Sequence, residues 1–188
     1  MSFEGKKRGL SRDLYLTKLL FMQQKNLNRN GLFKTVLLTG LFVGTMDLAS
    51  AYISVGASSG KFPATMLNYI AGGALGRDAA LAGGTPVAFL GLFFHFFIAC
   101  AYTTFFFLVF PYLRFLWYNK YLVGMLYAVF VNVTMGQVIL RLSCLPVGPF
   151  NLGRAVPDWM ILGVIFGIPI AYNAYRYYDA TVVADGGR

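Results

Sequence analysis

The sequence is poor in charge, and the few charged residues are mostly basic. Of the 188 residues, 12% are charged and 57% are hydrophobic, and 16 Lys and Arg face only seven Asp and Glu. Soluble domains carry about 25% charged residues, so this composition argues against a soluble protein. Nearly uncharged stretches of about 20 residues recur four times, which predicts four transmembrane helices. They lie at about 32–55, 86–110, 121–141 and 157–176.

Cysteine and histidine are also scarce. Two cysteines, Cys100 and Cys144, are too few for a disulfide framework, and His95 is the single histidine. A metal site needs more ligands than this set supplies, so we expect no metal and no cofactor. Sustained alternation of apolar and polar residues, typical of a transmembrane β-barrel, is missing.

Two further patterns are absent. The glycines between residues 72 and 84 lack a Gly-Lys-Ser/Thr ending and a preceding strand, which argues against a phosphate-binding loop. The N-terminus lacks a compact signal peptide, so we expect the whole chain to be retained.

The net charge of +9 is concentrated before and at the start of the first apolar stretch, where eight basic residues occur up to Lys34. This placement favours a cytoplasmic segment held near anionic lipid, and it does not favour nucleic acid as a partner. Counted by side of the membrane, twelve Lys and Arg lie on the side of both termini and four on the other. We therefore predict a multi-pass protein of the cell inner (plasma) membrane with both termini in the cytoplasm.

These observations predict an all-α membrane protein, an antiparallel bundle of four transmembrane helices. Residues 1–31 form a basic cytoplasmic segment, 32–178 the transmembrane domain and 179–188 a cytoplasmic tail. Residues 11–28 interleave leucines with charged residues, which favours an amphipathic helix on the membrane surface over a helix docked on the bundle. In the first external loop we expect a short helix from Pro63, stopped by Gly72-Gly73, and a second short turn at 77–81.

Small residues recur every three or four positions along each apolar stretch. At that spacing they lie on one face of a helix, where they let two backbones approach closely. Because lipid offers no hydrophobic drive for helices to associate, we expect the spans to pack through these faces. The glycines concerned are Gly40, Gly44, Gly91, Gly124, Gly136, Gly163 and Gly167.

Polar side chains fall on the same faces. An Asp near the middle of an apolar helix costs about 2.5–3.5 kcal/mol, so Asp47 is expected to face protein or water. Asp47 and His95 are each about eight or nine residues from the outer ends of their spans, or roughly 12–14 Å deep. We therefore predict that they meet in a polar seam, with Asn132 and Gln137 at nearby depths. At the outer boundary, Arg141 and Asp158 are predicted to pair.

The predicted Asp47–His95 pair has two interpretations. It can hold two helices in register, or it can respond to protons, since histidine titrates near neutrality. Catalysis is less well supported, because Ser50, one turn from Asp47, lacks the strand-to-helix turn of serine hydrolases. We expect that the protein is not an enzyme.

An ordered set of short motifs extends over about residues 34–146. The set is Gly44-Thr-Met-Asp47, Tyr69-Ile-Ala-Gly-Gly, Gly83-Gly84, Leu90-Gly-Leu-Phe-Phe-His95-Phe-Phe-Ile-Ala99 and Val123-Gly-Met-Leu-Tyr127. In these motifs the chain resembles a family of small four-helix bacterial inner-membrane proteins without an assigned function. The resemblance implies a fold and a membrane location, and it carries no activity with it. Where that family has Asn after the Met of its third helix, this chain reads Met135-Gly136.

The expected function is that of a structural or accessory subunit, which packs as a homo-oligomer or within a larger membrane complex. The alternative is a small oligomeric permease, channel or proton-linked sensor that uses Asp47 and His95. A single four-helix bundle leaves little room for a pore, so this alternative requires an oligomer.

Overall fold

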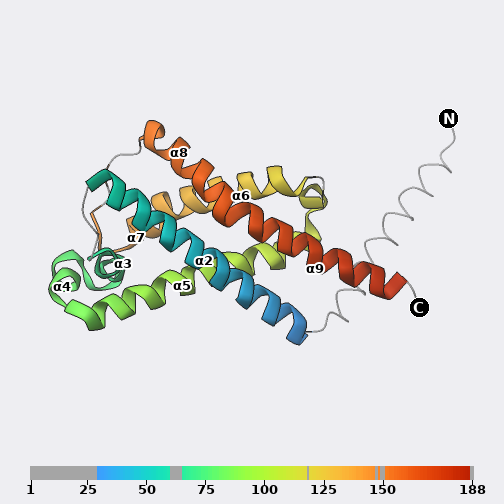
Figure 1. The fold of residues 1–188 in the computed structure, drawn as a ribbon, viewed down its shortest axis with the longest axis horizontal. Coiled ribbons are helices and arrows are strands. Elements are labelled where there is room, and N and C mark those ends of the chain that lie inside the picture. The colour runs from blue at the N-terminus through green and yellow to red at the C-terminus, as the bar shows by residue number, and fades with distance from the viewer. Residues whose placement is uncertain (1–28, 60–64, 118, 147, 149–150, 187–188) are drawn as a thin grey trace.

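The computed structural model describes residues 29–59, 65–117, 119–146, 148 and 151–186, and within these ranges it contains helices and no strand. Figure 1 shows the long helices side by side in an elongated body. The predicted amphipathic helix at 11–28 and the predicted helix start at Pro63 lie outside the described residues.

Four long helical segments and a helical loop make up the described chain. Two of the long segments contain a π-helical turn that joins two α-helical parts. The elements are α2 (Arg29–Ser59), α3 (Met66–Leu75), α4 (Arg77–Ala82), α5 (Gly84–Val109), the 3₁₀ turns η1 (Phe110–Tyr112) and η2 (Arg114–Trp117), α6 (Lys120–Thr134), the π turn η3 (Met135–Ile139), α7 (Leu140–Leu142), α8 (Leu152–Leu162), the π turn η4 (Gly163–Gly167) and α9 (Ile168–Gly186).

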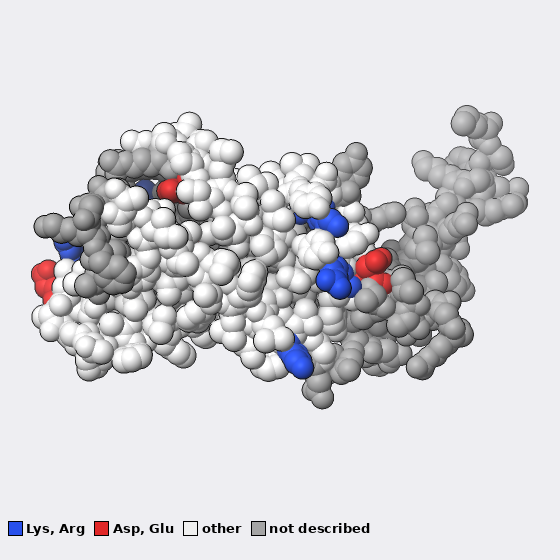
Figure 2. Space-filling model, viewed as in Figure 1, with Lys and Arg blue, Asp and Glu red and all other residues white. Residues whose placement is uncertain are grey.

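Four of these segments are long and apolar enough to cross a membrane: Gly31–Ala57, Gly84–Tyr112, Lys120–Leu142 and Ala155–Asp179. Each range encloses the corresponding range predicted from the sequence. In the face of the molecule that Figure 2 shows, charged side chains lie toward the two ends and the surface between them is uncharged. This distribution is the one that a bilayer requires, since charge inside the hydrocarbon region is costly.

The helical loop between the first two spans differs from the prediction at its glycines. Gly72 and Gly73 do not end the first short helix: α3 continues to Leu75, and the chain turns at Gly76, whose φ is +83°. Gly72 is buried, and an added Cβ there would lie 3.1 Å from Leu145. Gly72 therefore serves close packing, and Gly76 supplies the left-handed backbone that other residues rarely adopt.

The spans pack in two main pairs, α2 with α5, and α6 with the continuous segment α8–η4–α9. Gly40 lies against Cys100 and Thr103, whereas Gly44 lies against Phe96 and Ala99. Residue numbers thus rise along α2 as they fall along α5, so these two helices run in opposite directions. The second pair has the same reversed order, since Gly124 meets Ile168 while Asn132 meets Trp159. Contacts of α2 with η4 and α9 join the two pairs.

Phenylalanines of α5 divide between the core and the surface. Phe89, Phe93 and Phe97, at helical spacing, are 67%, 61% and 63% exposed, as expected for side chains that face lipid. Phe107 and, just beyond the helix, Phe110 are fully buried, and the Phe110 ring stacks on Tyr178 of α9 with centroids 5.5 Å apart. The phenylalanines of the second span therefore contribute both to the lipid-facing surface and to the core.

The π turn in the fourth span has a local cause. Pro169 follows η4 by two residues and has no N–H to donate to the carbonyl four residues earlier. A local change to i→i+5 hydrogen bonding accommodates such a gap, and the N–H of Ile168 donates to Gly163 in this pattern.

Candidate functional site

His95 lies at the interface of α2 and α5 and bonds to backbone. Its Nε2 atom is 2.8 Å from the carbonyl oxygen of Gly44. A carbonyl oxygen only accepts hydrogen bonds, so Nε2 carries the hydrogen and donates it. Gly44 has no side chain to cover its carbonyl, and an added Cβ there would lie 3.0 Å from the Phe96 ring. The glycine thus brings α5 close enough for the imidazole to reach the backbone of α2.

Asp47 lies one turn after Gly44 on the same helix, half-buried and within electrostatic range of His95. The sequence predicts that His95 meets Asp47 at the same depth. In the structure His95 instead contacts Gly44, which lies one turn before Asp47 on α2. The histidine bond goes to the Gly44 carbonyl, and within the described ranges the Asp47 carboxylate has neither a hydrogen bond nor an ion pair. The Ser50 hydroxyl donates to the backbone oxygen of Asp47 at 2.9 Å.

Asn132 and Gln137 do not extend this contact into one seam. The indole Nε1 of Trp159 donates to Oδ1 of Asn132 at 2.9 Å, which links α6 to α8. Gln137 lies in η3 and accepts a bond of 3.2 Å from Nε of Arg141, one turn away on the same segment. Among the described residues, no ion pair joins Arg141 to Asp158. The predicted seam therefore consists of separate contacts: one between α2 and α5, one between α6 and α8, and one within the third span.

Six of the seven glycines predicted to pack lie at close contacts within the chain. Gly40 and Gly44 face α5, and Gly124, Gly163 and Gly167 belong to the α6 interface with η4. Gly91 differs from the expectation of span-to-span packing: an added Cβ would overlap the Leu67 carbonyl oxygen of the short helix α3. Gly136 makes no close contact, since an added Cβ would meet nothing within 4 Å.

Tyrosine and asparagine side chains provide further bonds that the sequence pattern did not reveal. The Tyr127 hydroxyl donates to the Tyr102 carbonyl at 2.6 Å, and the Tyr178 hydroxyl donates to the Phe107 carbonyl at 2.7 Å. Buried Asn68 donates to the carbonyls of Ala80 and Gly84, at 3.1 and 2.8 Å, and so fixes the loop helices to the start of α5. Tyrosines within the spans resemble ordinary apolar core residues in a sequence, and no residue spacing indicates that a hydroxyl will bond to the backbone of another helix.

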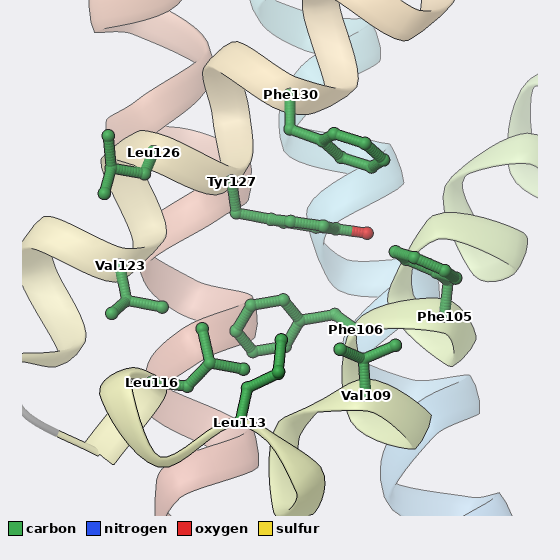
Figure 3. Close-up of a pocket in the computed structure, with 9 residues that line it drawn as sticks. All are labelled: Phe105, Phe106, Val109, Leu113, Leu116, Val123, Leu126, Tyr127 and Phe130. Carbon is green, nitrogen blue, oxygen red and sulfur yellow. The ribbon is translucent and has the colours of Figure 1, made fainter.

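An apolar groove lies between α5 and α6, where these consecutive spans diverge (Figure 3). Its volume is about 250 Å³. The lining side chains come from α5, the connecting turns and α6: Phe105, Phe106, Val109, Leu113, Leu116, Val123, Leu126, Tyr127 and Phe130. In the described part of the chain, no three His, Cys, Asp or Glu side chains gather as a metal site would require.

The polar side chains fall into two groups, those that bond to another helix and those that do not. Those of His95, Asn132, Tyr127 and Tyr178 bond to another helix, whereas Asp47 has no bonded partner in the described chain. Comparison of the chain with family models, with curated proteins and with solved structures gave no match.

Proposed function

We propose that the protein is a structural or accessory subunit of the inner membrane, an antiparallel four-helix bundle without catalytic activity. One observation carries this proposal: four hydrogen bonds from polar side chains join different spans. His95 links α5 to α2, Tyr127 links α6 to α5, Tyr178 links α9 to α5, and Trp159 links α8 to α6. Polar groups used in this way hold helices together and leave few free to line a path for solutes.

The outward surface supports the same role. Six of the seven glycines predicted to pack make close contacts inside the chain, and the outward surface includes large apolar side chains such as Phe93, Phe97 and Leu108. Such side chains pack equally well against lipid and against another apolar helix. The excess of basic residues on the side of the termini favours a cytoplasmic location for both termini, and the segment 1–31 there would attract anionic lipid.

The proposal predicts that the protein leaves the membrane in a complex. We expect a particle heavier than a single chain when the protein is extracted together with its surrounding lipid into polymer nanodiscs and weighed by mass photometry. Cross-linking in intact membranes before extraction should capture the same species. A single chain without any partner, in nanodiscs and after cross-linking alike, contradicts the accessory role.

A second function, proton-linked transport or sensing, is favoured by Asp47. This carboxylate lies inside an apolar span beside His95 and has no bonded partner within the described residues. Under this function, liposomes with the protein acidify faster than empty ones, and Asp47→Asn abolishes the difference. In His95→Gln the amide can still donate to the Gly44 carbonyl, so the contact between α5 and α2 is kept while the titratable imidazole is lost. This variant therefore tests proton exchange without removing the helix contact. If protons enter liposomes at the same rate with the wild-type protein, with Asp47→Asn and with His95→Ala, the transport function is ruled out.

A further inference from the structure

The groove between α5 and α6 is closed on most sides. The rings of Phe105 and Phe130 stack across its inner end with centroids 5.8 Å apart, so one residue from each wall closes it. Leu113 and Leu116 of the connecting turns lie at the other end, and the ribbons of α2 and α9 pass behind it (Figure 3). The groove is therefore a pocket that opens sideways between two spans.

The depth of the groove matches one leaflet of a bilayer. Lys120 begins the third span, and Phe130, at the inner end of the groove, follows it by about 15 Å along the helix at about 1.5 Å per residue. The hydrocarbon core of a bilayer is about 30 Å thick, so one leaflet is about 15 Å deep. The groove thus extends from a membrane boundary to about the midplane.

The size of the groove selects a thin occupant. A helix with its side chains is about 10–12 Å across, which a volume of about 250 Å³ does not admit. Left empty, the groove would leave its lining atoms without partners for dispersion contacts. A flexible hydrocarbon chain fills such a space without opening the bundle.

The chemistry of the lining selects an apolar occupant. Eight of the nine lining side chains are hydrocarbon, and the ninth, Tyr127, already donates its hydroxyl to the Tyr102 carbonyl. Its ring also packs on Phe106, with centroids 4.6 Å apart. The lining therefore presents a hydrocarbon surface to its occupant.

Two cations lie at this boundary, Lys120 at the start of α6 and Arg176 on the neighbouring α9. The Lys120 ammonium is 4.8 Å from the Tyr172 ring centroid, and Arg176 approaches the same ring at 5.8 Å. Neither cation forms an ion pair with a carboxylate among the described residues. Lys120 is one turn before Val123 of the groove, so a phosphate at this boundary lies within reach of its long side chain.

We propose that the groove between α5 and α6 holds one acyl chain of an anionic phospholipid from the leaflet at the Lys120 end. This inference rests on the membrane location in the proposed function and is independent of the accessory role. The bound lipid would fill the divergence between the second and third spans and become part of the bundle.

Lipid retention tests the proposal. The protein is reconstituted into vesicles of equal parts phosphatidylglycerol and phosphatidylcholine, extracted in mild detergent and examined by native mass spectrometry. We expect wild type to retain one phosphatidylglycerol per chain. Val109→Trp and Leu113→Trp, which fill the groove, should retain none, whereas Phe97→Trp, on the exposed face of α5, should retain it. Lys120→Gln should lose the preference for phosphatidylglycerol over phosphatidylcholine.

A second measurement remains decisive if the groove-filling variants fail to fold. Leu126→Trp places a fluorophore in the groove wall and Phe97→Trp places one outside it, each read against the parent protein. Brominated acyl chains should quench both in vesicles, and after dilution into detergent only the tryptophan at position 126 should stay quenched. Loss of quenching at both positions, or lipid retention equal in Val109→Trp and Phe97→Trp, overturns the proposal, as does a second protein copy cross-linked through the groove.

Discussion

Replacing Gly167 by alanine is expected to lower the free energy of unfolding by about 3 kcal/mol, near the upper end of the overpacking range. The added Cβ would overlap the Gly124 carbonyl oxygen and lie 2.8 Å from its carbonyl carbon and 3.2 Å from the Ala128 Cβ. The obstacle is backbone and cannot rotate away, so α6 and η4 must separate. Unfolding in mixed micelles, followed by circular dichroism as the fraction of denaturing detergent rises, measures the change.

Gly136→Ala is the matched control, because Gly136 continues the third span and has nothing within 4 Å of an added Cβ. Alanine in a helix is favoured over glycine by about 0.5–1 kcal/mol, so this variant should be as stable as wild type or slightly more stable. Equal loss of stability in Gly167→Ala and Gly136→Ala would mean that the close contact of Gly124 with Gly167 does not form in the membrane protein.

Hydropathy is sufficient to locate the four apolar helices, because about 20 uncharged residues in a row have few alternatives to a membrane span. Depth is also readable from sequence: counting residues from the span ends placed His95 within one turn of its true neighbour on α2. What counting does not provide is the atom that accepts the bond. Gly44, with no side chain of its own, exposes a carbonyl that competes with the Asp47 carboxylate for the imidazole.

The rotation of each helix about its axis is the information that was missing. Asn132 lies at a depth close to that of His95, but its side chain points toward α8, where Trp159 donates to it. A spacing of four residues falls about 40° beyond one full turn, so three such steps place Gly136 roughly 120° around the helix from Gly124. Gly136 therefore leaves the face on which Gly124 meets Ile168, and nothing lies within 4 Å of an added Cβ there.

The loop between the first two spans is part of the packed body, because its helix α3 packs against α5. A loop with short helices was expected from its glycines, but no local pattern indicates that α3 lies directly on α5. The fixing residue is Asn68, whose side-chain bonds reach residues 12 and 16 positions later. Contacts of this kind depend on how the chain folds back, so they appear only in three dimensions.

Gly91→Ala should release the helical loop from α5. The added Cβ would overlap the Leu67 carbonyl oxygen and lie 2.7 Å from its carbon and 3.3 Å from the Ala71 nitrogen. An overpacking cost of about 1–3 kcal/mol raises the open fraction of the loop roughly 5- to 150-fold. Ala71 lies at the contact of α3 with Gly91 and is fully buried. We therefore expect maleimide to label Ala71→Cys faster by that factor, in a chain that carries Cys100→Ala and Cys144→Ser.

Gly73→Ala supplies the control for this experiment. Gly73 lies two residues from Ala71 on the same short helix, and its nearest neighbour for an added Cβ is Ser143 at 3.7 Å, an ordinary contact. In Gly73→Ala the cysteine at position 71 should be labelled at the same rate as in the parent chain. If Gly91→Ala leaves the cysteine at position 71 equally protected, α3 is held by Asn68 and the chain connection alone. If only Gly91→Ala exposes it, the second span binds α3 at Gly91 and α2 at Ala99 and Thr103, so this helix joins the loop to the bundle.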